Sequence, residues 1–326
     1  MKALLLFLCF ILIASGSIAQ EPFREDVQVT LVSLYVTALN DAGEVQTGLT
    51  ADNFVLTEDG FSQTINSFSA GSEDVPLTVA FLVDNSGSMT RDDLEMARSA
   101  GLLLLNEMKS DDKMFLIAFR QDAASLVEPT FDTKKLQNML LSMKPRYGNT
   151  ALYDAISLTA EKLNHELGRK VLILFSDGQD NSSTKRFNDL LAGVAGLSDI
   201  TVLSIGTLFH TSEASRFVAF QEYKKGREAL EKLADVTGGA AVFPETKASM
   251  EKSLSDFRNL IRKQYTLGYY PTNRARDSSW RQIRIECKRK GVKLSYRKGY
   301  VSPGPITSIQ TEQTTSSEKN GSEPHR

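Results

Sequence analysis

Apolar and polar residues alternate along the middle of the chain in two patterns. Short apolar runs, such as Leu77–Val83 and Val171–Phe175, are typical of strands buried on both faces of a sheet. Longer stretches between these runs carry apolar residues every three or four positions, which predicts amphipathic helices. Repeated strand–helix units favour a parallel sheet with helices on both faces. We therefore predict a doubly wound, mostly parallel α/β sheet for residues 76–263.

The boundaries of the expected elements follow from the same pattern. We expect strands at Leu77–Val83, Lys113–Phe119, Val171–Phe175, Ile200–Ile205 and Ala240–Phe243, with an edge strand near Ser125–Glu128. We expect helices at Arg91–Met108, Thr133–Met143, Leu152–Leu167, Lys185–Leu197, Gly226–Thr237 and Lys247–Arg262. The stretch from Leu208 to Lys225 contains several aromatic residues. It extends the helix that follows, which is the favoured interpretation, or it forms an insertion that binds a partner.

Both ends of the chain show the two-residue alternation of strands with one buried face. Residues 20–75 contain several such runs, and residues 264–302 contain three more. Short strands of this kind bury little surface alone. We therefore expect the two end segments to pair in a small β-sandwich that flanks the α/β sheet. Residues 303–326 are rich in Ser, Thr, Gln and Glu, which predicts a disordered tail.

The first nineteen residues predict a targeting segment. Lys2 precedes an apolar stretch, and Ser17-Ile18-Ala19 supplies the small residues that a signal peptidase recognises. The apolar stretch is short for a transmembrane helix, and no later run is long and apolar enough to span a bilayer. We therefore expect residues 1–19 to be a signal peptide and the mature chain to be periplasmic or extracellular.

Charge and cysteine content narrow the classes of partner. The formal net charge is −2 at pH 7, and it would be −3 without Lys2. Such a balanced charge disfavours nucleic-acid binding and attraction to anionic lipid. Without Cys9, Cys287 is the one cysteine that remains, so the core must stabilise the fold without an internal disulfide. We expect Cys287 to be buried in a strand; a disulfide between two copies is the alternative.

Oxygen ligands follow directly after two of the buried strands. Asp84, Ser86 and Ser88 form an Asp-x-Ser-x-Ser turn after one strand, and Asp177 follows another. Thr150 stands in the loop before a third helix. Carboxylates and hydroxyls suit Mg²⁺, Mn²⁺ or Ca²⁺ better than zinc or copper, and ligands of open α/β sheets bind where strands end. The alternative for the first turn is a serine-rich turn that only opens a helix.

These five residues, in this order, resemble the metal-ion-dependent adhesion site of von Willebrand factor type A domains. The resemblance spans about Pro76 to Lys263 and is greatest to bacterial secreted proteins built on such a domain. It implies a Rossmann-like fold and one bound divalent ion, Mg²⁺ first, with Mn²⁺ or Ca²⁺ as alternatives. It implies direct bonds from Ser86 and Ser88, and direct or water-mediated bonds from Asp84, Thr150 and Asp177.

The same resemblance implies a function. Only two of the five ligands are charged, so the ion stays electrophilic, and an Asp or Glu carboxylate of a partner protein would complete its shell. The chain would then be an adhesion or protein-binding module. In domains of this kind the last helix, here Lys247–Arg262, slides when the ion exchanges a direct Asp ligand, here Asp177, for a direct Thr ligand, here Thr150. The alternative is a rigid site with a single state.

Two other functions fit parts of the sequence. A structural domain would use the ion only to hold its loops in place. A metal-dependent hydrolase would need a general base near the ion, but His165, His210 and His325 all lie outside the motif segments. The turn after Asp84 also lacks the flanking glycines of the Gly-x-Ser-x-Gly nucleophile turn. We therefore expect no enzyme activity.

Overall fold

The computed structural model describes most of the chain between residues 31 and 304. The described ranges are 31–71, 75–120, 125–144, 148–197, 199–207 and 216–304. The expected signal peptide, nearly all of the expected tail and the first part of the 208–225 stretch lie outside them. Within these ranges, none of the helices combines the length and the apolar composition needed to cross a membrane.

A six-stranded sheet forms the centre of the molecule, in the order β10-β9-β8-β5-β6-β7. Its strands are β5 (Leu77–Asp84), β6 (Lys113–Phe119), β7 (Ser125–Thr130), β8 (Arg169–Ser176), β9 (Ile200–Gly206) and β10 (Ala240–Val242). Five of them run parallel, and β7 pairs antiparallel with β6 at one edge. Every residue of β5 and β8 is buried, as expected of strands covered on both faces.

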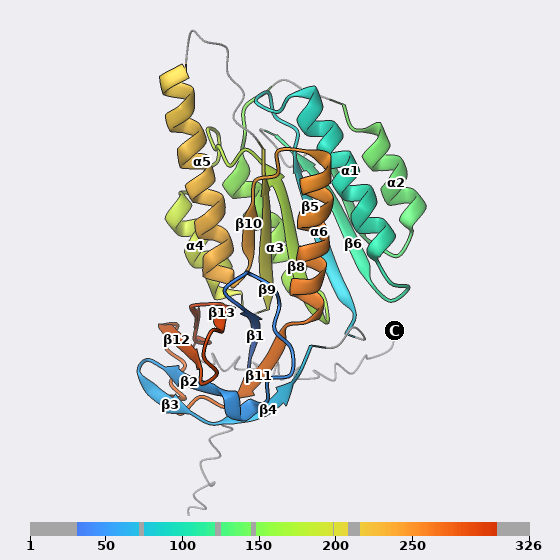
Figure 1. Ribbon diagram of the computed structural model, residues 1–326. Helices are drawn as coiled ribbons and strands as arrows, with labels where there is room; N and C mark the ends of the chain where they lie inside the picture. The colour runs from blue at the N-terminus through green and yellow to red at the C-terminus, as the bar shows by residue number, and fades with distance from the viewer. Residues whose placement is uncertain are drawn as a thin grey trace, which may run out of the picture.

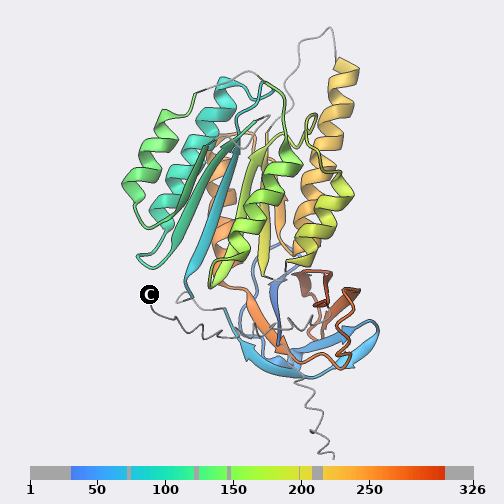
Figure 2. The ribbon, with the colours of Figure 1, turned by 180° about the vertical axis from the view of Figure 1, so that it is seen from behind.

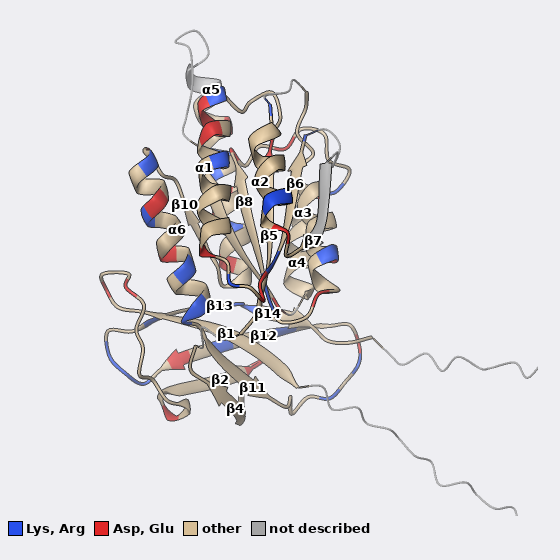
Figure 3. Cartoon of the chain, turned by 90° about the vertical axis from the view of Figure 1, so that its right-hand side faces the viewer, with Lys and Arg blue, Asp and Glu red and all other residues tan. Residues whose placement is uncertain are grey.

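Helices cover both faces of this sheet (Figures 1 and 2), with α1, α2 and α6 on one face and α3, α4 and α5 on the other. They are α1 (Arg91–Glu107), α2 (Thr133–Ser142), α3 (Leu152–Asn164), α4 (Phe187–Gly196), α5 (Arg216–Thr237) and α6 (Lys247–Arg262). Phe81 of β5 packs in one apolar core with α1, α2 and α6. Its neighbour Leu82 packs in a second core with α3, α4 and α5. Charged residues gather on the helices and loops, whereas the central strands carry few (Figure 3).

Strands from the two ends of the chain lie side by side beneath the central sheet (Figure 1). One sheet has the order β13-β1-β11-β4 and the other β14-β12-β2-β3. From the N-terminal end come β1 (Val32–Leu39), the short helix η1 (Ala51–Asn53), β2 (Phe54–Glu58), β3 (Phe61–Gln63) and β4 (Ile65–Ser69). From the C-terminal end come β11 (Tyr265–Tyr269), β12 (Trp280–Cys287), β13 (Lys293–Tyr296) and β14 (Gly299–Val301).

The two flanking sheets share one apolar core, which joins residues far apart in sequence, such as Leu34, Phe54 and Leu267. The predicted fold class, a doubly wound α/β sheet with a flanking β-unit from both chain ends, is confirmed. The domain boundaries 20–75, 76–263 and 264–302 stay a prediction.

Some details of the prediction differ from the structure. Helix α5 begins at Arg216 rather than at Gly226, so part of the 208–225 stretch extends the helix, as the favoured interpretation had it. The backbone of Gly226 packs directly on the loop at Gly178, and a Cβ on either glycine would collide with backbone atoms of the other segment. Cys287 lies in β12 as expected, but it is half-buried rather than buried.

Candidate metal centre

The strand order places two of the predicted ligands on neighbouring strands. Asp84 is the last residue of β5, and β8 lies beside β5 in parallel register, with Val83 opposite Phe175. Ser176 and Asp177 therefore emerge next to Asp84, at the edge of the sheet where the strands end. On the other side Asp84 pairs with Phe119, the last residue of β6.

The Asp84 carboxylate is fully buried and fixed at both oxygens. Oδ1 accepts a hydrogen bond from the Ser86 backbone N–H at 2.9 Å, and Oδ2 accepts one from the Ser176 hydroxyl at 2.8 Å. The hydroxyl oxygens of Ser86 and Ser88 lie 3.1 Å apart. The turn thus gathers one carboxylate and two hydroxyls within a few ångströms.

Asp177 joins the same group from the end of β8. Its Oδ1 accepts from the Gln179 backbone N–H at 3.0 Å, and its Oδ2 accepts from Gln179 Nε2 at 3.1 Å. The Ser88 hydroxyl also donates to this carboxylate. Asp84, Ser86, Ser88 and Asp177 therefore form one connected cluster.

Thr150 reaches this cluster through its loop rather than through a direct contact of its side chain. The carbonyl of Gly148 accepts from the Gly87 N–H at 3.1 Å, which ties the loop to the serine turn. The Thr150 N–H donates to Asn181 Oδ1 at 2.7 Å, and its carbonyl accepts from the Asn181 and Ser182 N–H groups. Thr150 is 2 % exposed, so its position is fixed at the rim of the site.

Burial and neighbouring negative charge raise the pKa values of both carboxylates. Burial, and then the charge of Asp177, raise the pKa of Asp84 to about 7, although hydrogen bonds from Ser86 and Ser176 oppose the shift. Burial also raises the pKa of Asp177, and the charge of Asp93 adds to this effect. Two buried carboxylates of like charge are costly without a cation between them.

The donor set fits a hard divalent cation. Its members are carboxylate and hydroxyl oxygens, and two further buried oxygens of the same loops, Asn85 Oδ1 and Ser182 Oγ, have no hydrogen-bond partner within the described residues. Nowhere in the described ranges do three or more His, Cys, Asp or Glu side chains gather in a metal-binding group, so the hydroxyls would be essential here. This chemistry suits Mg²⁺, Mn²⁺ or Ca²⁺.

Several residues that shape the site escaped the sequence analysis. Ser176, Gln179 and Asn181 form hydrogen bonds with the candidate ligands, yet nothing in a single sequence distinguishes them from other polar loop residues. Two other acidic residues near the site stabilise loops. Asp180 accepts from the Tyr153 N–H at 3.2 Å, and Asp154 accepts from the Thr184 N–H at 2.8 Å.

A comparison with known families now identifies the domain. Residues 79–179 match the family model of the von Willebrand factor type A domain, and all five predicted ligands lie inside the match. The chain contains a von Willebrand factor type A domain. The resemblance to that family is thereby confirmed. The match covers the first four strands of the α/β domain together with α1, α2 and α3.

Curated relatives of this von Willebrand factor type A domain protein share only part of it. The 67 kDa subunit of magnesium chelatase from Heliobacterium mobile is 34% identical over 109 residues, which are 32% of this chain and 16% of that protein. An uncharacterised protein of Methanocaldococcus jannaschii is 32% identical over 105 residues, which are 30% of this chain and 59% of the relative. The chain thus spans less than two thirds of either relative.

Solved structures of similar fold share little sequence with this chain. A von Willebrand factor type A protein from Catenulispora acidiphila has a TM-score of 0.46 at 12% identity, over 85% of this chain and 75% of that one. The proximal thread matrix protein 1 of the mussel byssus, with zinc in its metal-ion-dependent adhesion motif, has a TM-score of 0.44 at 14% identity. That match covers 59% of this chain and 49% of the mussel chain.

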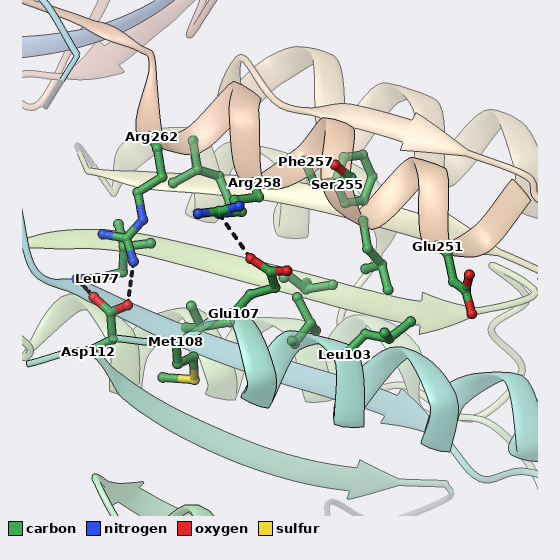
Figure 4. Close-up of a pocket in the computed structure, with 15 residues that line it drawn as sticks. Leu77, Leu103, Glu107, Met108, Asp112, Glu251, Ser255, Phe257, Arg258 and Arg262 are labelled. Carbon is green, nitrogen blue, oxygen red and sulfur yellow. Dashed lines mark hydrogen bonds and ion pairs between the residues drawn. The ribbon is translucent and has the colours of Figure 1, made fainter. Parts of the chain in front are cut away.

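A separate cavity of about 100 Å³ lies between α1 and α6 (Figure 4). Apolar side chains such as Leu104, Met108 and Phe257 line it, and an ion pair of 3.0 Å between Glu107 and Arg258 spans it. Leu77, the first residue of β5, also lines the cavity, so the cavity reaches the end of the sheet opposite the candidate metal site.

Proposed function

We propose that Asp84, Ser86, Ser88, Thr150 and Asp177 bind one divalent cation, and that this cation holds a carboxylate of a partner protein. The observation that carries the proposal is the pair of buried carboxylates, Asp84 and Asp177, whose pKa values are both raised. A cation between them removes the cost of burying both charges.

The expected chemistry follows from the charges. Two carboxylates neutralise a divalent ion, and the neutral hydroxyls of Ser86, Ser88 and Thr150 leave it a good acceptor for a further anion. Ser88 is exposed, so a ligand can approach from that side. Mg²⁺ prefers six oxygens and keeps water where the protein supplies too few, and such a water is what a partner's carboxylate replaces.

We further propose that the mature chain acts outside the cytoplasm, because residues 1–19 have the pattern of a signal peptide. A binding role is favoured over catalysis. His165 is the C-cap of α3 and so lies at the helix end far from the Thr150 loop, while His210 and His325 lie outside the described residues. A structural ion that only holds the loops is the second candidate, because the Thr150 loop and the serine turn already contact each other.

Isothermal titration tests the metal site. We expect wild-type protein to bind one equivalent of Mg²⁺ or Mn²⁺, with Zn²⁺ as a comparison ion, and Asp84→Asn to lose binding. Asp256→Asn, at an exposed position of α6, is the matched control and should bind as wild type. If Asp84→Asn binds the metal as tightly as wild type, the ion is not bound at the proposed site.

A pull-down from periplasmic or extracellular extract separates adhesion from a structural role. With wild-type protein as bait, a partner should be captured in Mg²⁺ and released by a chelator. Asp84→Ala should capture nothing if the ion holds the partner. If the folded Asp84→Ala variant still captures the same partner, the ion is structural.

A further inference from the structure

Helix α5 runs along the central sheet and continues past the edge at which the strands end. At the C-terminus of α5, Thr237 Oγ1 accepts a hydrogen bond from the Val202 N–H, near the start of β9, at 3.0 Å. Earlier in the helix, Gly226 packs against Gly178, at the level where the strands end. Residues 216–225 therefore extend beyond the sheet, by about 15 Å at the rise of an α-helix. Figure 1 shows this part of α5 above the ends of β9 and β10.

Phe220 lies in this projecting part of α5, and its helix face can be identified from Arg227. The two residues are seven positions apart, close to two helical turns, so they share one face of the helix. The Arg227 guanidinium lies 4.0 Å from the ring centroid of Phe243, which directly follows β10. That ring in turn packs on Gly206, the last residue of β9. The face that carries Phe220 is thus turned toward the ends of the strands.

The candidate metal site lies next to this face. Asp177 follows β8, and β8 lies beside β9 with Ser176 opposite Gly206. The Asp177 carbonyl is so close to Gly226 that a Cβ on this glycine would lie 2.3 Å from it. Phe220 is six positions before Gly226, so about 9 Å along the helix axis separate its backbone from this contact. An apolar group attached to a metal-bound carboxylate is therefore within reach of Phe220.

The Phe220 side chain is 49% exposed, so its ring is accessible to a partner. One exposed ring is common on protein surfaces, so its position beside the candidate metal site decides its role. Aromatic side chains are enriched at the centres of protein interfaces, where they supply apolar contact area. The proposed ion supplies a polar anchor but no apolar area, and Phe220 supplies that area.

We propose that Phe220 is the apolar contact of the partner-binding surface, so that the partner presents a large apolar side chain close to the carboxylate that binds the ion. This inference rests on the proposed function, because the ion holds the carboxylate in place. It narrows the partner from any protein with an exposed Asp or Glu to a segment in which an acidic side chain has a large apolar neighbour.

The probes are acetate and octanoate, which share the carboxylate and differ in the apolar chain. With Mn²⁺-loaded full-length protein, the paramagnetic relaxation of the ligand protons reports binding beside the ion. We expect wild-type protein to bind octanoate about ten-fold more tightly than acetate, as burial of about two methylene groups would give. Phe220→Gln should bind acetate as wild type does and should lose most of the preference for octanoate. Phe220→Leu keeps an apolar side chain and should retain it.

The control is Phe61→Gln, which removes a 72% exposed ring from β3 of the flanking unit and should keep the wild-type preference. A preference for octanoate that survives in Phe220→Gln, or that wild type lacks, overturns the inference and leaves the metal site intact. If Phe220→Gln instead changes the molecular mass in solution and wild type shows no preference, this face is a contact between two copies, and the inference is wrong. If wild-type protein binds no Mn²⁺, or binds Mn²⁺ but neither carboxylate, the proposed function fails and the inference fails with it.

Discussion

Arg262 at the end of α6 forms an ion pair with Asp112, which precedes β6, and both side chains are almost completely buried (Figure 4). Asp112 also accepts from the Leu77 N–H at 2.8 Å, and Arg262 Nη1 donates to the Val75 carbonyl at 3.1 Å. The pair therefore joins the strand that enters the α/β sheet to the helix that leaves it. The junction between the two parts of the molecule is fixed by polar contacts as well as by apolar packing.

Loss of this pair should destabilise the whole protein. Arg262→Leu leaves the Asp112 charge buried without its cation, so we expect the free energy of unfolding to fall by about 3–5 kcal/mol. Urea denaturation measures the change. The control is Lys252→Met, which breaks an exposed ion pair with Asp256 and should change stability by less than about 1 kcal/mol. Equal effects of the two substitutions would mean that the buried pair contributes no more than a surface pair.

The ion pair also shows what a single sequence leaves out. The strands of the central sheet were predictable because burial on both faces leaves nearly continuous apolar runs, as in Leu77–Asp84. Four of the five candidate ligands, Asp84, Ser86, Ser88 and Asp177, could be proposed because they follow those runs within a few residues. Asp112 and Arg262 are 150 residues apart, and only the folded chain brings them together. The same holds for Ser176 and Asp84, which are 92 residues apart.

Local exceptions explain the errors in the element boundaries. Glycine disfavours a helix interior, so the pattern begins a helix at Gly226. In the folded protein Gly226 is required inside α5, because the helix backbone packs on Gly178 in the loop after Asp177. A tertiary contact beside the candidate metal site thus overrides the local preference. Strand β14 was missed as a separate element because three residues are too few to show an alternation.

The stability of the metal-free protein should fall as the pH rises, and Mg²⁺ should offset this loss. Asp84 has a pKa of about 7 in the folded protein, above its ordinary value of 3.8, so the folded state binds the proton more tightly than the unfolded state does. Without metal, the contribution of Asp84 is therefore present below about pH 4 and is lost as the pH rises to about 7. We expect the rise in Tm caused by Mg²⁺ to be larger at pH 8 than at pH 5.

Thermal unfolding at several pH values, with Mg²⁺ and with a chelator, checks this dependence. Asp84→Asn removes the titrating group and should flatten the metal-free profile between about pH 4 and pH 7. An unchanged profile in that variant would assign the pH dependence to other groups.

The two serines should matter for the ion more than for the fold. Replacing Ser86 and Ser88 together by alanine removes two hydroxyl ligands but keeps the backbone N–H of Ser86 that binds Asp84. We expect Mg²⁺ affinity to fall by at least ten-fold, in the range that loss of one or two ligand bonds gives. Isothermal titration measures it, and Ser253→Ala in α6 serves as the control. Binding as tight as that of wild type would exclude both serines as ligands.

The flanking unit should fold only when both chain ends are present. β1 lies between β11 and β13, and the Tyr265 hydroxyl accepts from the Leu49 N–H at 3.1 Å. Deleting residues 264–302 removes both neighbours of β1, so its amides should lose their protection from hydrogen exchange. The amides of β5 are the internal control and should stay protected. Continued protection of β1 would show that the N-terminal strands fold alone.

The last prediction concerns α6, the helix for which the family resemblance implies a slide. In this protein a slide of α6 would have to separate Arg262 from Asp112, and the Arg169 guanidinium also donates to the Ile261 carbonyl at the same end. Breaking a buried ion pair costs several kcal/mol, about 3–5 kcal/mol in comparable cases. A ligand that couples two states commonly supplies about 1–3 kcal/mol. The free energy needed to break the ion pair exceeds the free energy that a ligand would contribute, so we expect a single position of α6 with and without ligand.

Methyl NMR can follow this helix through Met250, which is fully buried on α6, with Met114 on β6 as the fixed reference. In wild-type protein the Met250 signal should stay single and unshifted when Mg²⁺ and acetate are added. In Arg262→Leu, where the pair no longer holds the helix, a second Met250 signal or a ligand-dependent shift should appear. A ligand-dependent shift of Met250 in wild type, with Met114 unmoved, would mean that the helix slides despite the ion pair. The pair would then set the balance between two states instead of fixing one.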